Sequence, residues 1–235
     1  MNQLQLREEG FTMLPDIFSS HEVDIIIDSI GKTDASGPLF RKTNDLFAIR
    51  QFLKELPQTA ELIFTKTFKG IIRDYAGEDY FVVKSIYFDK PDGSNWFVAW
   101  HQDLTIAVDK RLECNGFSGW TSKQGAFAVQ PPADILESVL TFRIHLDDTD
   151  EENGALRVIP GSHRKGVIRI DGKEGRAPDG RVCAVKKGGV MVMKPLMLHA
   201  SGRVMNNKRR RVIHIEFCNR ELPQGLDWAE YMRVW

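Results

Sequence analysis

The sequence predicts a mainly β domain, an antiparallel sandwich or barrel, with helices from the N-terminal third packed on its outer face. Two observations support this fold class. Apolar residues recur at helical spacing before residue 80, whereas short segments rich in β-branched and aromatic residues follow it. Gly, Pro and Asn separate these later segments, and no helical pattern alternates with them. Many short strands without interleaved helices favour antiparallel sheets.

Three helices are expected in the N-terminal third. Ser19 and Glu22 have the spacing of a capping box at the start of the first, which Gly31 is expected to end. The apolar stripe of this helix consists of Val23, Ile26, Ile27 and Ile30. The second helix is expected at about residues 45–55, before a proline, and the third at about residues 58–75, before a glycine.

Six later segments have the composition of strands. They are Tyr80–Phe88, Ser138–Leu146, Ala155–Pro160, Val182–Val185, Val190–Lys194 and Arg211–Cys218. By contrast, the stretch from Leu104 to Pro132 is expected to be a long loop. Long loops in compact domains tend to be functional, so we expect this one to form a lid or a pocket wall. The segment at 161–180, which is rich in glycine and charge, is expected to do the same.

Two of the strands have one polar face, because strand side chains alternate between faces. In the first, Leu140, Phe142, Ile144 and Leu146 alternate with Val139, Thr141, Arg143 and His145. In the last, Arg210, Val212, His214 and Glu216 share one side. The apolar face is expected to meet the helices or a second sheet. The polar faces either line an interior pocket or meet solvent, as in many half-solvated antiparallel sheets.

Length and charge limit the class of protein. A chain of 235 residues is long enough for one sizeable domain, and we expect a single domain with its helical part at about 19–77 and its barrel at about 80–218. The 32 basic and 32 acidic residues cancel, so we expect neither a nucleic acid nor a membrane as partner. The expected partner is a small molecule, and the sequence leaves the oligomeric state open.

The cysteines and the first residues bear on the compartment. Cys114, Cys183 and Cys218 are widely spaced and odd in number, which is typical of a reducing compartment and gives no zinc-ligand pattern. Residues 1–10 are polar and acidic, unlike a signal peptide, and no stretch has the apolar length of a membrane span. We therefore expect a cytoplasmic protein.

One short motif indicates a metal site. His101 and Asp103 are two positions apart, so on a strand their side chains lie on the same face. With a second imidazole, for which His199 is the candidate, they would form the two-histidine, one-carboxylate triad of non-haem Fe(II) oxygenases. The motif alone is weak. A lone His-x-Asp is more often a surface or hydrogen-bonded pair, and a lone histidine is as often a hydrogen-bonded core residue.

Three ordered motifs resemble the phytanoyl-CoA dioxygenase family. They are Trp100–Asp103, the run Asn153–His163, and Leu198–Gly202 followed by Asn206–Arg211. Members of this family are Fe(II)- and 2-oxoglutarate-dependent oxygenases built on a double-stranded β-helix, a jelly-roll or cupin-like barrel. The resemblance extends from about residue 80 to residue 217, and also includes the opening at residues 10–18. It implies that fold and dioxygenase activity with Fe(II), 2-oxoglutarate and dioxygen.

The resemblance also assigns roles to the metal-site residues. It implies that His101, Asp103 and His199 ligate the iron, and that one oxygen atom of dioxygen reaches an unactivated C–H bond as a hydroxyl group. Halogenating relatives lack the carboxylate at the position of Asp103. Its presence predicts a hydroxylase rather than a halogenase.

Further roles concern the cosubstrate. Arg210 lies where the family places the arginine that pairs with the distal carboxylate of 2-oxoglutarate, and Arg211 is the alternative if the alignment slips by one residue. Ser201 and Gln102 occupy positions that contact the cosubstrate in relatives. Arg143 departs from the pattern, because some relatives have an aromatic residue there beside 2-oxoglutarate. It either alters cosubstrate packing or binds an anionic group.

The substrate pocket is predicted less sharply. His145, His214 and Trp120 are its candidates. Trp96 and Trp100 either add aromatic surface near the iron or pack in the core. A polar or anionic substrate is expected if the polar strand faces point inward. Two other functions stay open: a cupin-like metalloenzyme that does not use 2-oxoglutarate, and a barrel that binds a small molecule without catalysis.

Overall fold

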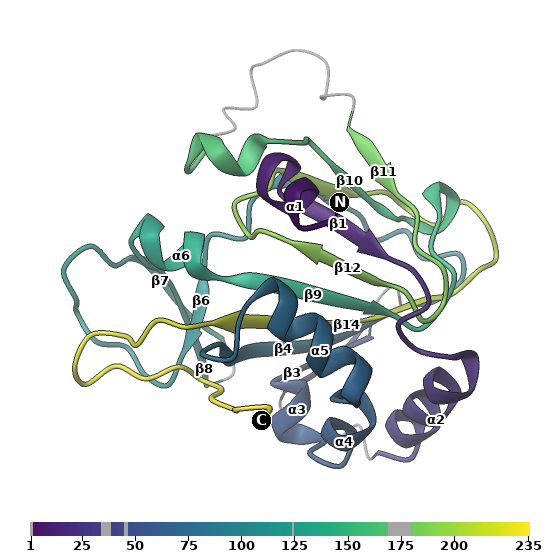
Figure 1. Ribbon diagram of the computed structural model, residues 1–235, viewed down its shortest axis with the longest axis horizontal. Coiled ribbons are helices and arrows are strands. Elements are labelled where there is room, and N and C mark those ends of the chain that lie inside the picture. The colour runs from purple at the N-terminus through teal and green to yellow at the C-terminus, as the bar shows by residue number, and fades with distance from the viewer. Residues whose placement is uncertain (1, 34–38, 45–46, 124, 169–179) are drawn as a thin grey trace.

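The computed structural model describes residues 2–33, 39–44, 47–123, 125–168 and 180–235. Within these residues the body of the molecule is formed by two antiparallel sheets (Figure 1). The larger has the order β1 (Phe11–Leu14), β12 (Val190–Met193), β9 (Leu140–His145), β14 (Arg210–Cys218), β4 (Phe81–Lys90), β3 (Phe47–Arg50) and β2 (Phe40–Lys42). The smaller has the order β11 (Arg181–Cys183), β10 (Leu156–Val158), β13 (His199–Ser201) and β5 (Val98–His101).

The chain passes between the two sheets in the pattern of a double-stranded β-helix. From β4 it moves to β5 in the smaller sheet, from β9 to β10, and from β12 to β13 before returning to β14. The central strands of the larger sheet are β12, β9, β14 and β4, and all their pairings are antiparallel. The predicted fold class is therefore confirmed, although the sheets remain separate rather than closing into a continuous barrel.

The first predicted helix is confirmed as α2 (Ser20–Gly31). Both halves of its capping box form: the Ser19 side chain accepts from the backbone N–H of Glu22, and the Glu22 carboxylate accepts from the backbone N–H of Ser19 at 2.8 Å. Its apolar stripe buries Val23, Ile26 and Ile30 in the main core.

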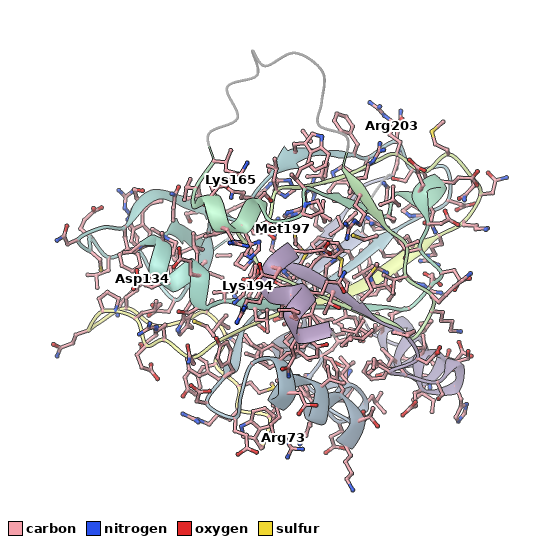
Figure 2. All side chains as sticks on the ribbon, turned by 45° about the horizontal axis from the view of Figure 1, so that its top comes forward. Arg73, Asp134, Lys165, Lys194, Met197 and Arg203 are labelled. Carbon is pink, nitrogen blue, oxygen red and sulfur yellow. The ribbon has the colours of Figure 1, made fainter. Side chains whose placement is uncertain are left out.

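Helices cover the outer face of the larger sheet. Figure 1 shows α5 (Lys66–Tyr75) in front of this sheet, with α2, α3 (Phe52–Glu55) and α4 (Thr59–Ile63) toward the bottom of the view. The ring of Phe68 on α5 lies 5.8 Å from that of Phe142 on β9. The apolar face of β9 thus meets the helices, as predicted. In Figure 2, Arg73 on α5 and Arg203 after β13 lie at opposite ends of the view.

The second expected helix is wrong over most of its length. Residues 47–50 form β3, which pairs with β4 so that Ile49 lies opposite Tyr87 and is buried. Only Phe52–Glu55 is helical, and residues 45–46 lie outside the described part. The third expected helix is two helices, α4 and α5. The Thr65 side chain accepts from the N–H of Phe68 and so starts α5 as a separate N-cap.

The stretch from Leu104 to Pro132 is not a loop. It forms a third antiparallel sheet of β6 (Ile106–Val108), β8 (Ala126–Gln130) and β7 (Ser118–Lys123), followed by α6 (Ala133–Ser138). Most side chains of β7 are exposed, so the alternation that identifies a half-buried strand is missing. The helix α1 (Asn2–Glu9) and the strand β1 were also not predicted. No helix within the described ranges is long and apolar enough to cross a membrane.

Candidate metal centre

Two neighbouring strands bring the metal-site histidines together. His101 is the last residue of β5 and His199 the first of β13, and the two pair directly across the smaller sheet. Their ring centroids lie 4.2 Å apart. Asp103 lies two residues beyond the end of β5 rather than on the strand, which corrects the expected shared strand face. Its backbone N–H donates to the carbonyl of Pro195 at 3.0 Å, which fixes the turn that directs the carboxylate toward both rings.

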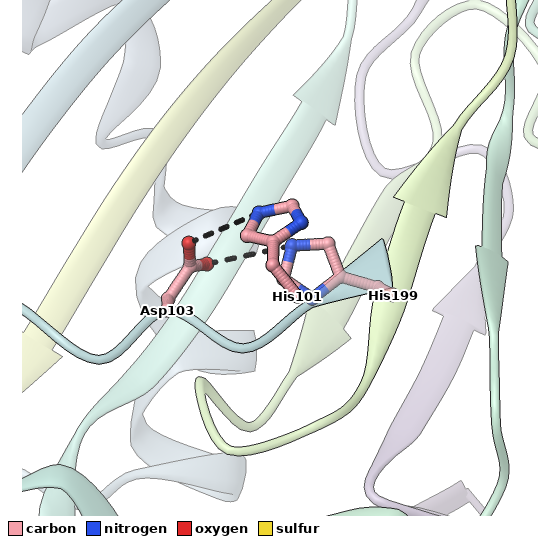
Figure 3. Close-up of side chains that lie close together, drawn as sticks. All are labelled: His101, Asp103 and His199. Atoms are coloured by element: carbon pink, nitrogen blue, oxygen red, sulfur yellow. Dashed lines mark ion pairs between the residues drawn. The ribbon is translucent and has the colours of Figure 1, made fainter. Parts of the chain in front are cut away.

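The three side chains surround a common point (Figure 3). The two carboxylate oxygens of Asp103 lie 3.8 Å from His101 Nε2 and 3.7 Å from His199 Nε2. These distances are too long for hydrogen bonds. Two ligands that each lie about 2 Å from one ion are at most about 4 Å apart, so the spacing suits a metal between them.

Backbone contacts orient both imidazoles for metal binding. Nδ1 of His101 lies 2.8 Å from the carbonyl of Ala99, and Nδ1 of His199 lies 2.8 Å from the carbonyl of Met197. A carbonyl oxygen only accepts hydrogen bonds, so each Nδ1 carries the proton. The lone pair of each Nε2 is then directed at the ligand point, as in metal-binding histidines held by a hydrogen bond to the other nitrogen. The residues present therefore fit a divalent metal.

Charge and burial favour the metal-binding protonation states. Burial lowers the pKa of His199 to about 4, so its imidazole is neutral at neutral pH. Burial alone would raise the pKa of Asp103, but His199, Lys84 and His214 outweigh it and hold that pKa well below its usual value. A neutral imidazole and an ionised carboxylate are the forms that bind metals.

The triad opens into a cavity of about 220 Å³ between the two sheets. Its lining residues are Lys84, Ile86, Phe88, Trp96, Val98, His101, Asp103, Arg143, Leu156, His199, Ser201, Arg210 and His214. Apolar side chains line it from both sheets, Ile86 and Phe88 from β4 and Leu156 and Val98 from the smaller sheet, and most of the other lining side chains are polar. The polar faces of β9 and β14 thus point inward, and the solvent-facing alternative is excluded for Arg143, His214 and Arg210, which are buried.

Strand alternation separates Arg210 from Arg211. Arg210 points into the cavity, where Nη1 donates to the carbonyl of Gly154 at 2.5 Å and Nη2 lies 3.5 Å from Ser201 Oγ. Its Nε has no hydrogen-bond partner among the described residues. Burial and the charge of Arg143 lower the pKa of Arg210 to about 9. Arg211 points to the opposite face and forms two hydrogen bonds with Asp147, at 2.8 and 2.7 Å.

The backbone conformation at Gly154 requires a glycine at this position of the run Asn153–His163. Its φ is +81°, and a Cβ there would lie 2.7 Å from the Gly202 carbonyl oxygen. Asp150 and Asn153 form a capping box on the short 3-10 helix that precedes it. This turn presents the Gly154 carbonyl to Arg210 and also to Ser201 Oγ, which donates to it at 3.1 Å.

A second polar group lies beside Asp103. Arg143 Nη1 is 2.9 Å from His214 Nδ1, and His214 Nε2 is 2.9 Å from Glu216 Oε1. Lys84 Nζ donates to the same carboxylate oxygen at 2.8 Å. Ligand atoms of Asp103, His214 and Glu216 lie within 4.8 Å of one another. Lys84 was not predicted, although a lysine directly after the apolar run Phe81–Val83 was a usable signal.

Three predicted site residues do not line the cavity. The Gln102 amide donates to the carbonyls of Gly166 and Leu196, because the residue between two inward-facing ligands faces the other way. His145 is buried with Nδ1 2.8 Å from Thr149 Oγ1. Trp120 lies on β7 and packs against the cluster formed by the third sheet. Trp96, by contrast, lines the cavity. Most of the predicted segment at 161–180 cannot be compared, because residues 169–179 lie outside the described part.

The model of the family described as phytanoyl-CoA dioxygenase (PhyH) matches residues 6–212. The chain belongs to this family. The curated proteins include a probable alpha-ketoglutarate-dependent hypophosphite dioxygenase of Stutzerimonas stutzeri, 23% identical over 92% of this chain and 77% of that protein.

Solved structures share the fold. The crystal structure of EvdMO1 has a TM-score of 0.66 and 23% identity over 94% of this chain, which spans only 49% of that one. HygX from Streptomyces hygroscopicus, solved with nickel and 2-oxoglutarate bound, has a TM-score of 0.67 and 16% identity over 98% of this chain and 95% of that one.

Proposed function

We propose that the protein is a 2-oxoglutarate-dependent non-haem Fe(II) dioxygenase that hydroxylates an unactivated C–H bond of a small molecule. The observation that carries this proposal is the convergence of His101, Asp103 and His199 on one point of a cavity that also contains the buried Arg210. When bound, iron and 2-oxoglutarate would supply the activation of dioxygen, with one oxygen atom going to succinate as carbon dioxide is lost and the other to the hydroxyl group of the product.

The chain's own residues position the reactants. His101 and His199 would hold the metal through Nε2, and Asp103 through its carboxylate. Arg210 would bind the distal carboxylate of 2-oxoglutarate, because its Nε and Nη2 form an edge suited to a two-point grip. Ser201, which donates to the same Gly154 carbonyl as Arg210, keeps that guanidinium in place.

Hydroxylation is proposed over halogenation because Asp103 supplies a carboxylate at the third ligand position. With a metal bound, that carboxylate would take the position that a halide would need. The apolar side chains of Ile86, Phe88 and Leu156 in the lining help to exclude water, which protects the reaction from side reactions and strengthens the polar contacts. We also propose a reducing compartment such as the cytoplasm, because all three cysteines are free.

Succinate formation tests the function. Protein loaded with Fe(II) is incubated with 2-oxoglutarate, dioxygen and a panel of small molecules, with His199→Ala as the disabled variant and His21→Ala as a surface-histidine control. Succinate should form with the wild type and with His21→Ala but not with His199→Ala. Activity with another metal and no succinate would favour the cupin-like enzyme. No metal-dependent binding of 2-oxoglutarate would contradict the proposal.

A further inference from the structure

Arg143 is a buried guanidinium without a carboxylate partner within the described part of the chain. Its exposed fraction is 8%, and its Nη1 lies 2.9 Å from a neutral acceptor, His214 Nδ1. Its Nε has no hydrogen-bond partner among the described residues, and the side chain lines the cavity. Burying a charge costs free energy unless it is paired, so this arrangement calls for an anion from outside the chain.

The neighbours of Arg143 fix its donor groups. Glu216 accepts from Lys84 and from His214, so the His214 proton is on Nε2 and Nδ1 is an acceptor. Arg143 Nη1 must then be the donor to Nδ1. This chain of contacts holds the guanidinium in one orientation and leaves Nε among its donors without a partner. Such support is what orients a binding group before its ligand arrives.

The expected cosubstrate does not account for this arginine. Arg143 lies opposite His214 in the sheet, and His214 is four residues from Arg210 along β14. Because a strand rises by about 3.3 Å per residue, the backbone positions of His214 and Arg210 are roughly 13 Å apart. Glu216 and His214 lie within reach of Asp103, so Arg143 and its partners occupy the Asp103 side of the triad. A 2-oxoglutarate anchored by Arg210 would have its other carboxylate at the metal.

A count of charges leads to the same conclusion. Among the side chains of the described residues that line the cavity, Lys84, Arg143 and Arg210 are positive and Asp103 is negative. Glu216, behind Lys84, is also negative, so one positive charge remains. A divalent iron and a dianionic 2-oxoglutarate cancel each other. One monoanion would therefore neutralise the loaded site.

We propose that the substrate is a compact oxyanion, either a short carboxylate or a phosphorus oxyanion, that Arg143 and Lys84 hold on the Asp103 side of the metal. The size of the cavity supports this substrate class, because its 220 Å³ lies below the roughly 300–1,000 Å³ of pockets for larger ligands and must also contain 2-oxoglutarate. This inference rests on the proposed function and adds the substrate class to it.

Binding to the nickel-loaded protein tests the inference without turnover. The protein is saturated with 2-oxoglutarate and titrated by calorimetry with acetate and glycolate in one arm and with methylphosphonate in the other. Acetamide is the uncharged control. At least one oxyanion should bind the ternary complex, and acetamide should not. Whichever arm binds identifies the type of oxyanion.

Variants identify the residue responsible. Arg143→Gln should lower the affinity for the oxyanion at least tenfold and change the Kd of 2-oxoglutarate by less than threefold. Arg210→Ala should lower the affinity for 2-oxoglutarate. Arg143→Lys, which keeps a positive charge, should restore part of the oxyanion affinity. If Arg143→Gln weakens 2-oxoglutarate as much as Arg210→Ala does, Arg143 holds the cosubstrate and the inference is wrong.

The titration of the wild-type protein tests the inference even if the variants do not fold. If 2-oxoglutarate binds but no oxyanion in either arm does, the inference fails and the proposed function stands. If 2-oxoglutarate itself does not bind the nickel-loaded protein, the proposed function fails first.

Discussion

Replacing Arg210 by alanine should weaken the binding of 2-oxoglutarate to the metal-loaded protein by about 1.5–3 kcal/mol, the usual contribution of hydrogen bonds to a charged group. The structure supports this range because Arg210 Nη1 already donates to the Gly154 carbonyl. The edge formed by Nε and Nη2 is left to bind the carboxylate of 2-oxoglutarate. At about 1.4 kcal/mol per factor of ten, the Kd should rise roughly 10- to 150-fold.

The neighbouring arginine provides a matched control. Arg211→Ala removes the same functional group from the opposite face of β14, where it pairs with Asp147. It should leave the Kd of 2-oxoglutarate unchanged. Calorimetry on the nickel-loaded proteins measures both constants, and thermal unfolding shows whether each variant is folded. An unchanged Kd in a folded Arg210→Ala protein, or a weakened one in Arg211→Ala, would refute the assignment of Arg210.

Three further predictions concern other parts of the chain. Ser19→Ala should lower the free energy of unfolding by about 1 kcal/mol through loss of the capping box, and Ser20→Ala should change it less, as denaturant unfolding can measure. Gly154→Ala should lower both thermal stability and 2-oxoglutarate affinity, because its Cβ would collide with the Gly202 carbonyl; equal affinity would contradict this. Burial raises the pKa of Glu230 to about 7, so the folded state binds a proton that the unfolded state has lost, and stability should fall as pH rises from about 4.5 to about 7. Glu230→Gln should abolish that fall, of about 3 kcal/mol at most, in unfolding measured across this pH range.

The parts of the fold that the sequence predicts correctly are those with strong local signals. Ser19 and Glu22 specify the start of α2 by contacts three residues apart, and the alternation in β9 separates its helix-facing side from its cavity side. Local signals fail where distant pairing decides the structure. Residues 47–50 have a pattern that suits a helix, but β4 offers them a strand partner and a buried position for Ile49. The third sheet was missed because its outer strand is mostly exposed.

The candidate site shows the same division. The three metal-site residues were selected from motifs, and the structure brings them together through the pairing of β5 with β13. Gln102 was selected by its adjacency to two ligands, but adjacency in a motif does not give the direction of a side chain, and its amide donates to backbone carbonyls instead of lining the cavity. Lys84 and its pairing with Glu216 depend on the register of β4 with β14, which no pattern within either strand contains. Trp120 and His145 were chosen by residue type, and packing places both away from the cavity lining.

A calorimetric titration of metal-free protein, first with Fe(II) under anaerobic conditions and then with 2-oxoglutarate, tests the central claim most directly. We predict one ferrous ion per chain and binding of 2-oxoglutarate only after the metal, with both lost in His199→Ala. Binding of 2-oxoglutarate with equal affinity in the absence of metal, or full metal affinity in a folded His199→Ala protein, would contradict it.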